Sequence, residues 1–204
     1  LDFTAVTDHA EFMGEVRMCT TPGLPGYWHP VCIAHRNIPQ LSFLTFGAVG
    51  MSYKTRWGFC GDNNEVCFEQ ATDTWSEIQK ANETAYDRSS ECHFTSFVGY
   101  EWTAMQPDSG GNLHRNVVFR NATVPRLPAS FIDEPTAPRL WDSLDRHCNQ
   151  AGEGCDSLVI PHNSNLSAGF MFSGALDNGD AMTPQYAQTR QRHEPLVEIV
   201  QHKG

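Results

Sequence analysis

The chain is short of positive charge. It carries 14 lysine and arginine residues against 24 aspartate and glutamate residues, which gives a net charge of −10. This balance argues against nucleic-acid binding as the main role, because such proteins need a basic surface. No apolar run approaches the roughly 20 residues of a membrane-spanning helix. A phosphorylated small-molecule substrate stays compatible with the charge, since bound divalent cations would supply local positive charge.

Several well-known catalytic motifs are also missing. The sequence has no G-x-S-x-G nucleophile elbow, no phosphate-binding Walker loop and no G-x-G-x-x-G. Their absence argues against a serine hydrolase of the α/β-hydrolase type and against common nucleotide-binding folds. No C-x-x-C pair or Cys/His knuckle spacing is present either, so a structural zinc site is the weaker interpretation of the cysteines.

The seven cysteines instead indicate disulfides. Cys60 and Cys67 bracket the turn-rich GDNNEV, and Cys148 and Cys155 bracket NQAGEG. This spacing predicts two small disulfide-closed loops in an oxidising compartment, and we expect a periplasmic or secreted protein. Three further cysteines allow one more pair and leave an odd thiol: Cys19, Cys32 and Cys92.

Residues of metal-ligand type stand at the ends of apolar, β-prone runs. The opening run LDFTAV stops at Asp8 and His9, FTSFVGYEWT reaches Glu101, and SLVIPHNSN reaches His162. GNLHRNVVFR instead places His114 just before its run. Buried parallel strands deliver polar groups at their C-terminal ends. The repeated pattern therefore predicts strand ends that converge on one metal site.

Four motifs occur in the order TDHAE, GYEWT, NLHRNVVFR and IPHNSNLS. Together they resemble the PHP (polymerase and histidinol phosphatase) superfamily of metallohydrolases. Within it they are most similar to an uncharacterised bacterial branch of unknown function. The resemblance implies an α/β fold, a distorted (β/α) barrel with a mainly parallel sheet. Its strands are expected near 2–7, 95–102, 116–120, 157–161 and 196–201. Helical patterns cover residues 40–56, 71–88, 139–150 and 183–193.

The family barrel begins with His-x-His and ends with Asp-x-His, and this chain has neither pair at those places. We therefore expect residues 1–204 to form a single incomplete domain that lacks the first strand and the C-terminal part of the barrel. A large insertion is expected at about 13–70, since the first two strands are too far apart for one βα unit. Such a fragment is expected to bind metal weakly or not at all.

The resemblance implies His9, Glu101, His114 and His162 as ligands of two or three divalent ions, zinc, manganese or iron, with Glu101 able to bridge two of them. Further site residues are expected around these ligands. Asp8 would orient a ligand, Arg115 and Lys203 would hold a substrate anion, and Asn163 and Glu198 would lie beside the site. The alternatives are solvated surface charges for Arg115 and Lys203, a turn cap for Asn163, which could otherwise bond substrate, and a buried salt bridge for Glu198.

The expected activity is hydrolysis of a phosphate ester by a metal-bound hydroxide, because no protein nucleophile motif is present. Two alternatives stay open. The same kind of centre could hydrolyse amides, lactones or other esters. The chain could also be a disulfide-bearing binding domain that has lost catalysis, and metal content would separate that class from an enzyme.

Overall fold

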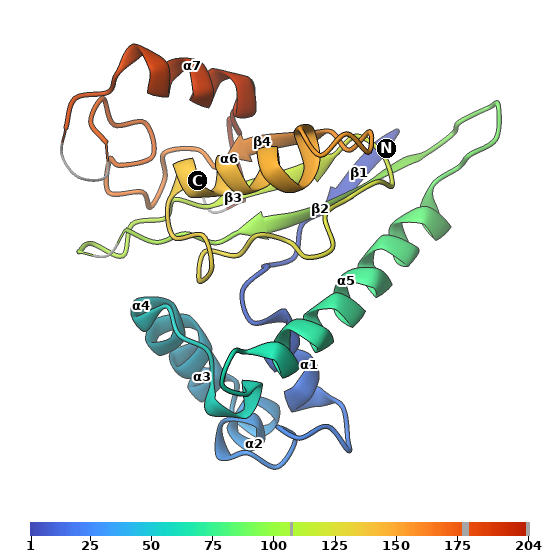
Figure 1. Cartoon of the computed structure of the whole chain (residues 1–204), viewed down its shortest axis with the longest axis vertical. Helices are drawn as coiled ribbons and strands as arrows, with labels where there is room; N and C mark the ends of the chain where they lie inside the picture. The colour runs from blue at the N-terminus through green and yellow to red at the C-terminus, as the bar shows by residue number, and fades with distance from the viewer. Residues whose placement is uncertain (107, 177–179, 203–204) are drawn as a thin grey trace.

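The computed structural model describes residues 1–106, 108–176 and 180–202. Its centre is one open sheet of four strands in the order β1-β2-β3-β4 (Figure 1). The strands are β1 (Phe3–Val6), β2 (Thr95–Trp102), β3 (Arg115–Phe119) and β4 (Ser157–Pro161). β1 is parallel to β2, whereas β2 pairs with β3 and β3 pairs with β4 in antiparallel fashion.

This mixed sheet corrects the expected fold, because the prediction of a PHP-type barrel and of a mainly parallel sheet is wrong. After β2 the chain turns back as a hairpin, in which Met105 forms an antiparallel bridge with Asn112. A hairpin returns the next strand antiparallel, whereas a parallel partner needs a longer crossover. The expected strand at 196–201 is also not formed among the described residues, although the Glu198 N–H donates to the Pro161 carbonyl at 3.1 Å.

The helices flank the sheet and form a separate lobe below it (Figure 1). They are α1 (Met13–Thr20), α2 (Pro30–Asn37), α3 (Pro39–Ser42), the π-helix η1 (Phe43–Gly50), α4 (Met51–Tyr53), the 3₁₀ turn η2 (Gly58–Cys60), α5 (Glu65–Ala85), α6 (Ala137–Leu144), the π-helix η3 (Asp145–Asn149) and α7 (Pro184–His193). All four predicted helical stretches lie on these elements. α1 and α2 fall within the Gly- and Pro-rich stretch 13–39 and were not predicted.

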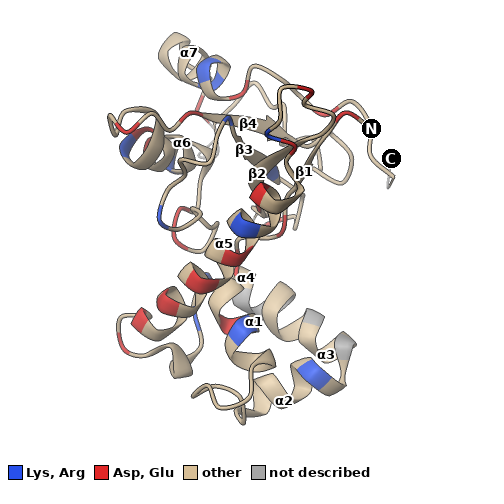
Figure 2. Cartoon of the chain, turned by 90° about the vertical axis from the view of Figure 1, so that its right-hand side faces the viewer, with Lys and Arg blue, Asp and Glu red and all other residues tan. Residues whose placement is uncertain are grey.

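One face of the sheet carries the core. Trp75 of α5 packs edge-on against Tyr100 of β2 and also contacts Phe119 of β3. α6 adds Leu140 and Trp141 to the same buried cluster. The opposite side of α5 is a solvent-exposed acidic stripe at four-residue spacing, Glu65, Glu69, Asp73 and Glu77 (Figure 2). α5 is therefore amphipathic, with its apolar side on the sheet.

The lobe is joined to the sheet by close helix packing and by a buried ion network. Gly14 allows α1 to approach α5, since a Cβ there would lie 1.9 Å from the Cys67 carbonyl oxygen. The next residue, Glu15, is fully buried and accepts from Arg56 Nη1 at 2.9 Å. Arg56 Nη2 donates to Asp133 at 2.6 Å. Arg56 thus ties α1 to the loop before α6.

Six of the seven cysteines form three disulfides. Both predicted pairs, Cys60–Cys67 and Cys148–Cys155, are confirmed. Cys19 pairs with Cys32 and holds α1 to α2. Cys92 is the odd cysteine, and it is free and exposed. Three such bonds are compatible with an oxidising, extracellular environment.

This pairing makes a simple chemical prediction. Iodoacetamide is expected to alkylate one cysteine, Cys92, in the native protein and all seven after reduction in denaturant. The reason is that the disulfide sulfurs are not nucleophiles, whereas an exposed thiol reacts through its thiolate. Intact-mass spectrometry counts the labels. Three or more labels on the native protein would contradict at least one of the disulfides.

Candidate metal centre

Three buried side chains from three strands meet at one end of the sheet. Glu101 lies near the end of β2, His114 directly precedes β3, and His162 directly follows β4. Antiparallel pairing brings the start of β3 beside the ends of β2 and β4. The position of His114 ahead of its strand, which a parallel sheet leaves unexplained, follows from this topology.

The carboxylate of Glu101 is the centre of the group. Its Oε1 lies 3.0 Å from His114 Nδ1 and 3.2 Å from His162 Nε2. Its Oε2 lies 2.6 Å from His9 Nδ1. One ligand atom from each of Glu101, His114 and His162 lies within 4.8 Å of the others. His9 is the outer member, because 65% of its side chain is exposed.

These contacts fix the charge of the carboxylate. Burial alone would raise the pKa of Glu101, but hydrogen bonds from His114 and His9 outweigh burial and hold that pKa well below its usual range. The hydrogen bond to Glu101 in turn raises the pKa of His9 above its ordinary 6.5, against partial burial. The centre therefore contains an ionised carboxylate that attracts cations.

Two residues that support the centre were missed in the sequence. Thr103 Oγ1 lies 2.6 Å from His9 Nδ1. Glu11, buried two residues after His9, accepts the N–H groups of Thr103 at 3.2 Å and of Phe131 at 2.7 Å. The available signal was the second carboxylate of the TDHAE motif. Glu11 thus fixes the backbone at Thr103, which contacts His9.

Three other predicted site residues lie outside the histidine–carboxylate group, and a fourth is not described. Asp8 is exposed, and its backbone carbonyl accepts the Glu101 N–H at 2.8 Å. Asn163 is buried, and its Oδ1 accepts the N–H of Asn165 at 3.0 Å, as a turn cap does. Glu198 Oε2 accepts the Asn163 N–H at 3.1 Å. Lys203 lies outside the described residues.

Arg115 points away from the centre. Successive residues of a strand face opposite sides, so Arg115 and His114 project to different faces. Arg115 Nε donates to Glu194 at 2.6 Å, and its guanidinium carbon lies 5.4 Å from the ring centre of Trp102. In this position its side chain does not contact the histidine–carboxylate group.

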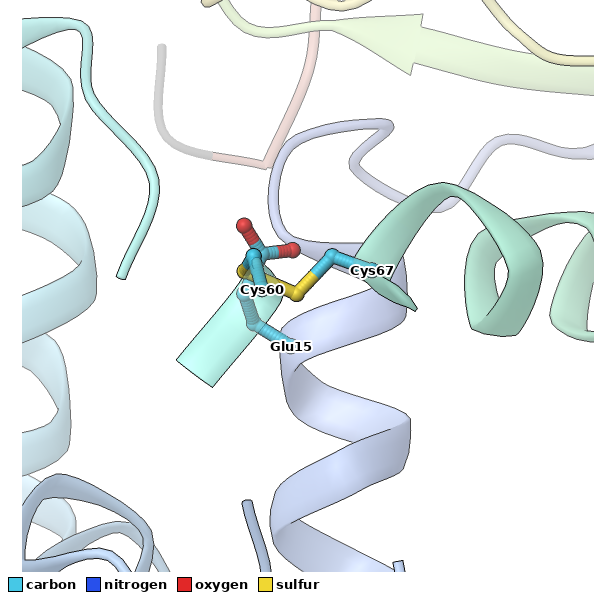
Figure 3. A group of neighbouring side chains, drawn as sticks. All are labelled: Glu15, Cys60 and Cys67. Carbon is cyan, nitrogen blue, oxygen red and sulfur yellow. A yellow bond between two sulfur atoms is a disulfide. The ribbon is translucent and has the colours of Figure 1, made fainter. Parts of the chain in front are cut away.

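A second group of ligand-type residues does not form a metal site. Glu15 lies beside Cys60 and Cys67 (Figure 3). The two sulfurs are joined in a disulfide, and the carboxylate is paired with Arg56. A metal would need free thiolates there. Among the residues that the structure describes, Glu101 and its histidines remain the group with ligands to offer.

The fold and the centre define a mixed α/β protein with a buried histidine–carboxylate group at one sheet end. The chain belongs to the family described as "Protein of unknown function (DUF3604)", whose model matches residues 1–204. No curated protein and no solved structure matches the chain. No helix in the described parts of the chain is both long and apolar enough to cross a membrane.

The family match corrects the resemblance drawn from the sequence. The expectation of a family of unknown function is confirmed, but the assignment to the PHP superfamily is wrong. The expectation of weak or no metal binding rested on the missing ends of that barrel, so it loses its basis. The matched family carries no such description, and the described strands form an open sheet instead of a barrel. The motifs marked strand ends that do meet, and such strand ends are not restricted to one fold.

Proposed function

We propose that this protein is a metal-dependent hydrolase whose metal centre is Glu101, His114 and His162, with His9 at its edge. One observation carries the proposal: a buried, ionised carboxylate has imidazole nitrogens at 2.6 to 3.2 Å on both of its oxygens. Outside active sites, such a concentration of titratable groups is uncommon.

The donor set fits a transition-metal ion. Two imidazoles and a carboxylate suit zinc, manganese or iron, and three protein ligands leave room for a substrate or water. The three ligand atoms already lie within 4.8 Å of one another, so a small shift would place them around one ion. Such an ion would lower the pKa of a water and polarise a phosphoryl or carbonyl oxygen.

The division of contacts between the two carboxylate oxygens supports a second ion. Oε1 of Glu101 faces His114 and His162, whereas Oε2 faces His9. A carboxylate arranged in this way can bridge two ions. His9, being more exposed, would give the second ion fewer buried contacts, so we propose that the second ion binds more weakly.

Within this centre the protein residues hold the ligand side chains in place and supply negative charge to balance the bound ions. Glu101 contributes the negative charge, and the buried His114 and His162 exclude water from the inner side. Thr103 orients the His9 ring through its 2.6 Å contact. Hydrogen bonds of this kind fix ligand geometry. We propose a phosphate ester as the substrate class, because bound cations would neutralise it in an otherwise acidic protein.

A substrate panel tests the proposal. The protein, loaded in turn with zinc, manganese and iron(II), is assayed on phosphate mono- and diesters, phosphonates, sulfate esters, amides and lactones. We expect phosphate-ester hydrolysis that His162→Ala reduces to background. The matched control is His93→Ala, which removes an exposed histidine paired with Glu91. Activity confined to amides or lactones would contradict the substrate class, and full activity in His162→Ala would contradict the centre.

Metal binding is expected to depend on pH in a defined direction. A histidine must be neutral to bind a metal, so binding displaces any proton that it carries. The hydrogen bond to Glu101 raises the pKa of His9 above 6.5, so His9 keeps its proton to a higher pH than an ordinary histidine, and the release falls in the window above 6.5. The affinity for zinc should therefore rise with pH through this window. Calorimetric titrations in buffers of different ionisation enthalpy measure the released proton.

The disulfides also support a proposal about the cellular compartment of the protein. We propose an exported, periplasmic protein, since three disulfides persist in oxidising compartments and are rare in the cytosol. The supporting observation is that Cys19–Cys32, Cys60–Cys67 and Cys148–Cys155 are all formed. Fractionation of expressing cells with thiol labelling tests it, and a fully reduced cytosolic pool would contradict it.

A further inference from the structure

A cavity lies at the same strand ends, on the sheet face opposite the candidate metal centre. Its volume is about 190 Å³, and Trp102, Arg115, Phe131, Tyr186 and Arg190 are among its lining residues. Side chains alternate along a strand, so Trp102 and Arg115 face this cavity while Glu101 and His114 face the candidate metal centre. The backbone of β2 and β3 separates the two, and the cavity is a site of its own.

The cavity is lined by cations in an acidic protein. Lys54, Arg115 and Arg190 line it, and Asp108, which is exposed, is the one acidic residue among its described lining residues. The Lys54 ammonium lies 4.9 Å from the ring centre of Phe131, which is itself part of the wall. Three of the 14 lysine and arginine residues thus surround one small volume.

The carboxylate of Glu194 holds Arg115 and Arg190 in place and leaves some of their N–H donors unbound. Glu194 Oε1 accepts from Arg115 Nε at 2.6 Å, and Glu194 Oε2 accepts from Arg190 Nε at 2.9 Å. One negative charge shared by two guanidinium groups leaves a net positive charge. Trp141 Nε1 also donates to Glu194 Oε1 at 3.1 Å. Glu194 therefore acts as a buried anchor that orients both arginines.

Each guanidinium keeps one terminal nitrogen for a ligand. Arg115 Nη1 donates to the Leu113 carbonyl, and Arg190 Nη2 donates to the Met171 carbonyl. Among the residues that the structure describes, Arg115 Nη2 and Arg190 Nη1 have no hydrogen-bond partner. Arg115 is only 4% exposed. A nearly buried guanidinium with an unused donor on a cavity wall is a site for an oxyanion.

Aromatic and apolar side chains share the rest of the wall with the polar Gln106, Thr136 and Ser173. Trp102, Phe131 and Tyr186 supply aromatic surface, and Met171 adds an adaptable thioether. Ligand pockets commonly combine such walls with a few convergent polar groups. We propose that this cavity binds a small molecule that carries an oxyanion group on an aromatic ring. The oxyanion pairs with Arg115, Arg190 and Lys54, and the ring packs against the aromatic wall.

Binding of simple probes tests this site. Isothermal titration calorimetry is done in EDTA, so that the candidate metal centre takes no part. Benzoate and phenyl phosphate are the probes, and acetate and benzyl alcohol are controls that lack the ring or the charge. We expect a probe to bind at least about tenfold more tightly than either control, as for one added charged hydrogen bond. Binding of only one probe supports the site and identifies its oxyanion.

Matched variants locate the binding. Lys54→Met and Arg190→Met each remove one cation while Glu194 keeps its partner Arg115, and Lys80→Met makes the same change on the exposed side of α5. We expect each cavity variant to weaken benzoate binding about tenfold and Lys80→Met to leave it unchanged. Thermal unfolding checks that each variant is folded, and a benzoate-soaked crystal gives a second measurement at Arg115.

Three results would overturn the proposal. The first is that neither probe binds. The second is that acetate or benzyl alcohol binds as tightly as the probes. The third is that folded Lys54→Met and Arg190→Met bind benzoate as tightly as Lys80→Met does. None of these results depends on hydrolytic activity. The proposal for the cavity can therefore fail while the metallohydrolase proposal holds, and the reverse is also true.

Discussion

Glu101→Gln is expected to lower the affinity for zinc by roughly a hundredfold or more, since even residues that only orient ligands contribute tenfold to a hundredfold. Both oxygens of Glu101 contact imidazoles, and its carboxylate is the only negative charge in the three-residue group. Glutamine keeps the shape but supplies one neutral oxygen. Calorimetric zinc titration and metal analysis after dialysis measure the loss.

The control for this experiment is Glu91→Gln. Glu91 also pairs with a histidine, His93 Nε2 at 2.7 Å, but both side chains are exposed. A carboxylate–histidine pair on the surface is thereby compared with one inside the candidate metal centre. Equal zinc affinity in the two variants would show that Glu101 is not a ligand.

Arg56→Met is expected to destabilise the protein by about 3–5 kcal/mol, the usual cost of leaving a buried charge without its partner. Glu15 has no exposed surface, and burial raises the pKa of Glu15 even with Arg56 beside it. Without Arg56 the carboxyl must either stay charged in the interior or take up a proton. The free energy of unfolding in urea, with the disulfides intact, gives the measurement.

Two further variants make this second prediction specific. Arg88→Met removes an exposed arginine that pairs with Glu83, and it should change the unfolding free energy too little to measure. Arg56→Met combined with Glu15→Met should recover most of the loss, since the unpaired charge is then absent. An Arg56→Met protein as stable as Arg88→Met would show that the network does not hold the lobe to the sheet.

Local sequence signals predicted most of the elements but not their arrangement. The apolar runs that end on Asp8 and Glu101 became β1 and β2, and helices formed where apolar spacing indicated them. Strand direction is set by the connections, and the connector after Glu101 folds back on itself through Met105 and Asn112. The family resemblance implied parallel strands there. We therefore expected a barrel where the structure has an open mixed sheet.

The candidate site was more predictable than the fold. Polar residues that end or precede apolar runs can meet at one end of a sheet whether its strands are parallel or antiparallel. His9, Glu101, His114 and His162 were chosen from the sequence, and the structure brings them together. Arg115 was expected to hold a substrate anion beside them, whereas alternation along β3 sends its side chain to the other face. Glu194, the partner of Arg115, comes from a helix end far along the chain, and no local pattern links the two.

The central claim is that Glu101, His114 and His162 bind a metal ion, and anomalous X-ray diffraction from crystals soaked in zinc tests it most directly. We predict an anomalous peak within about 2.0–2.2 Å of Glu101 Oε1, His114 Nδ1 and His162 Nε2. A second, weaker peak near Glu101 Oε2 and His9 would agree with the bridging role. Zinc bound elsewhere, with these three side chains in the hydrogen-bonded arrangement described above, would contradict the claim.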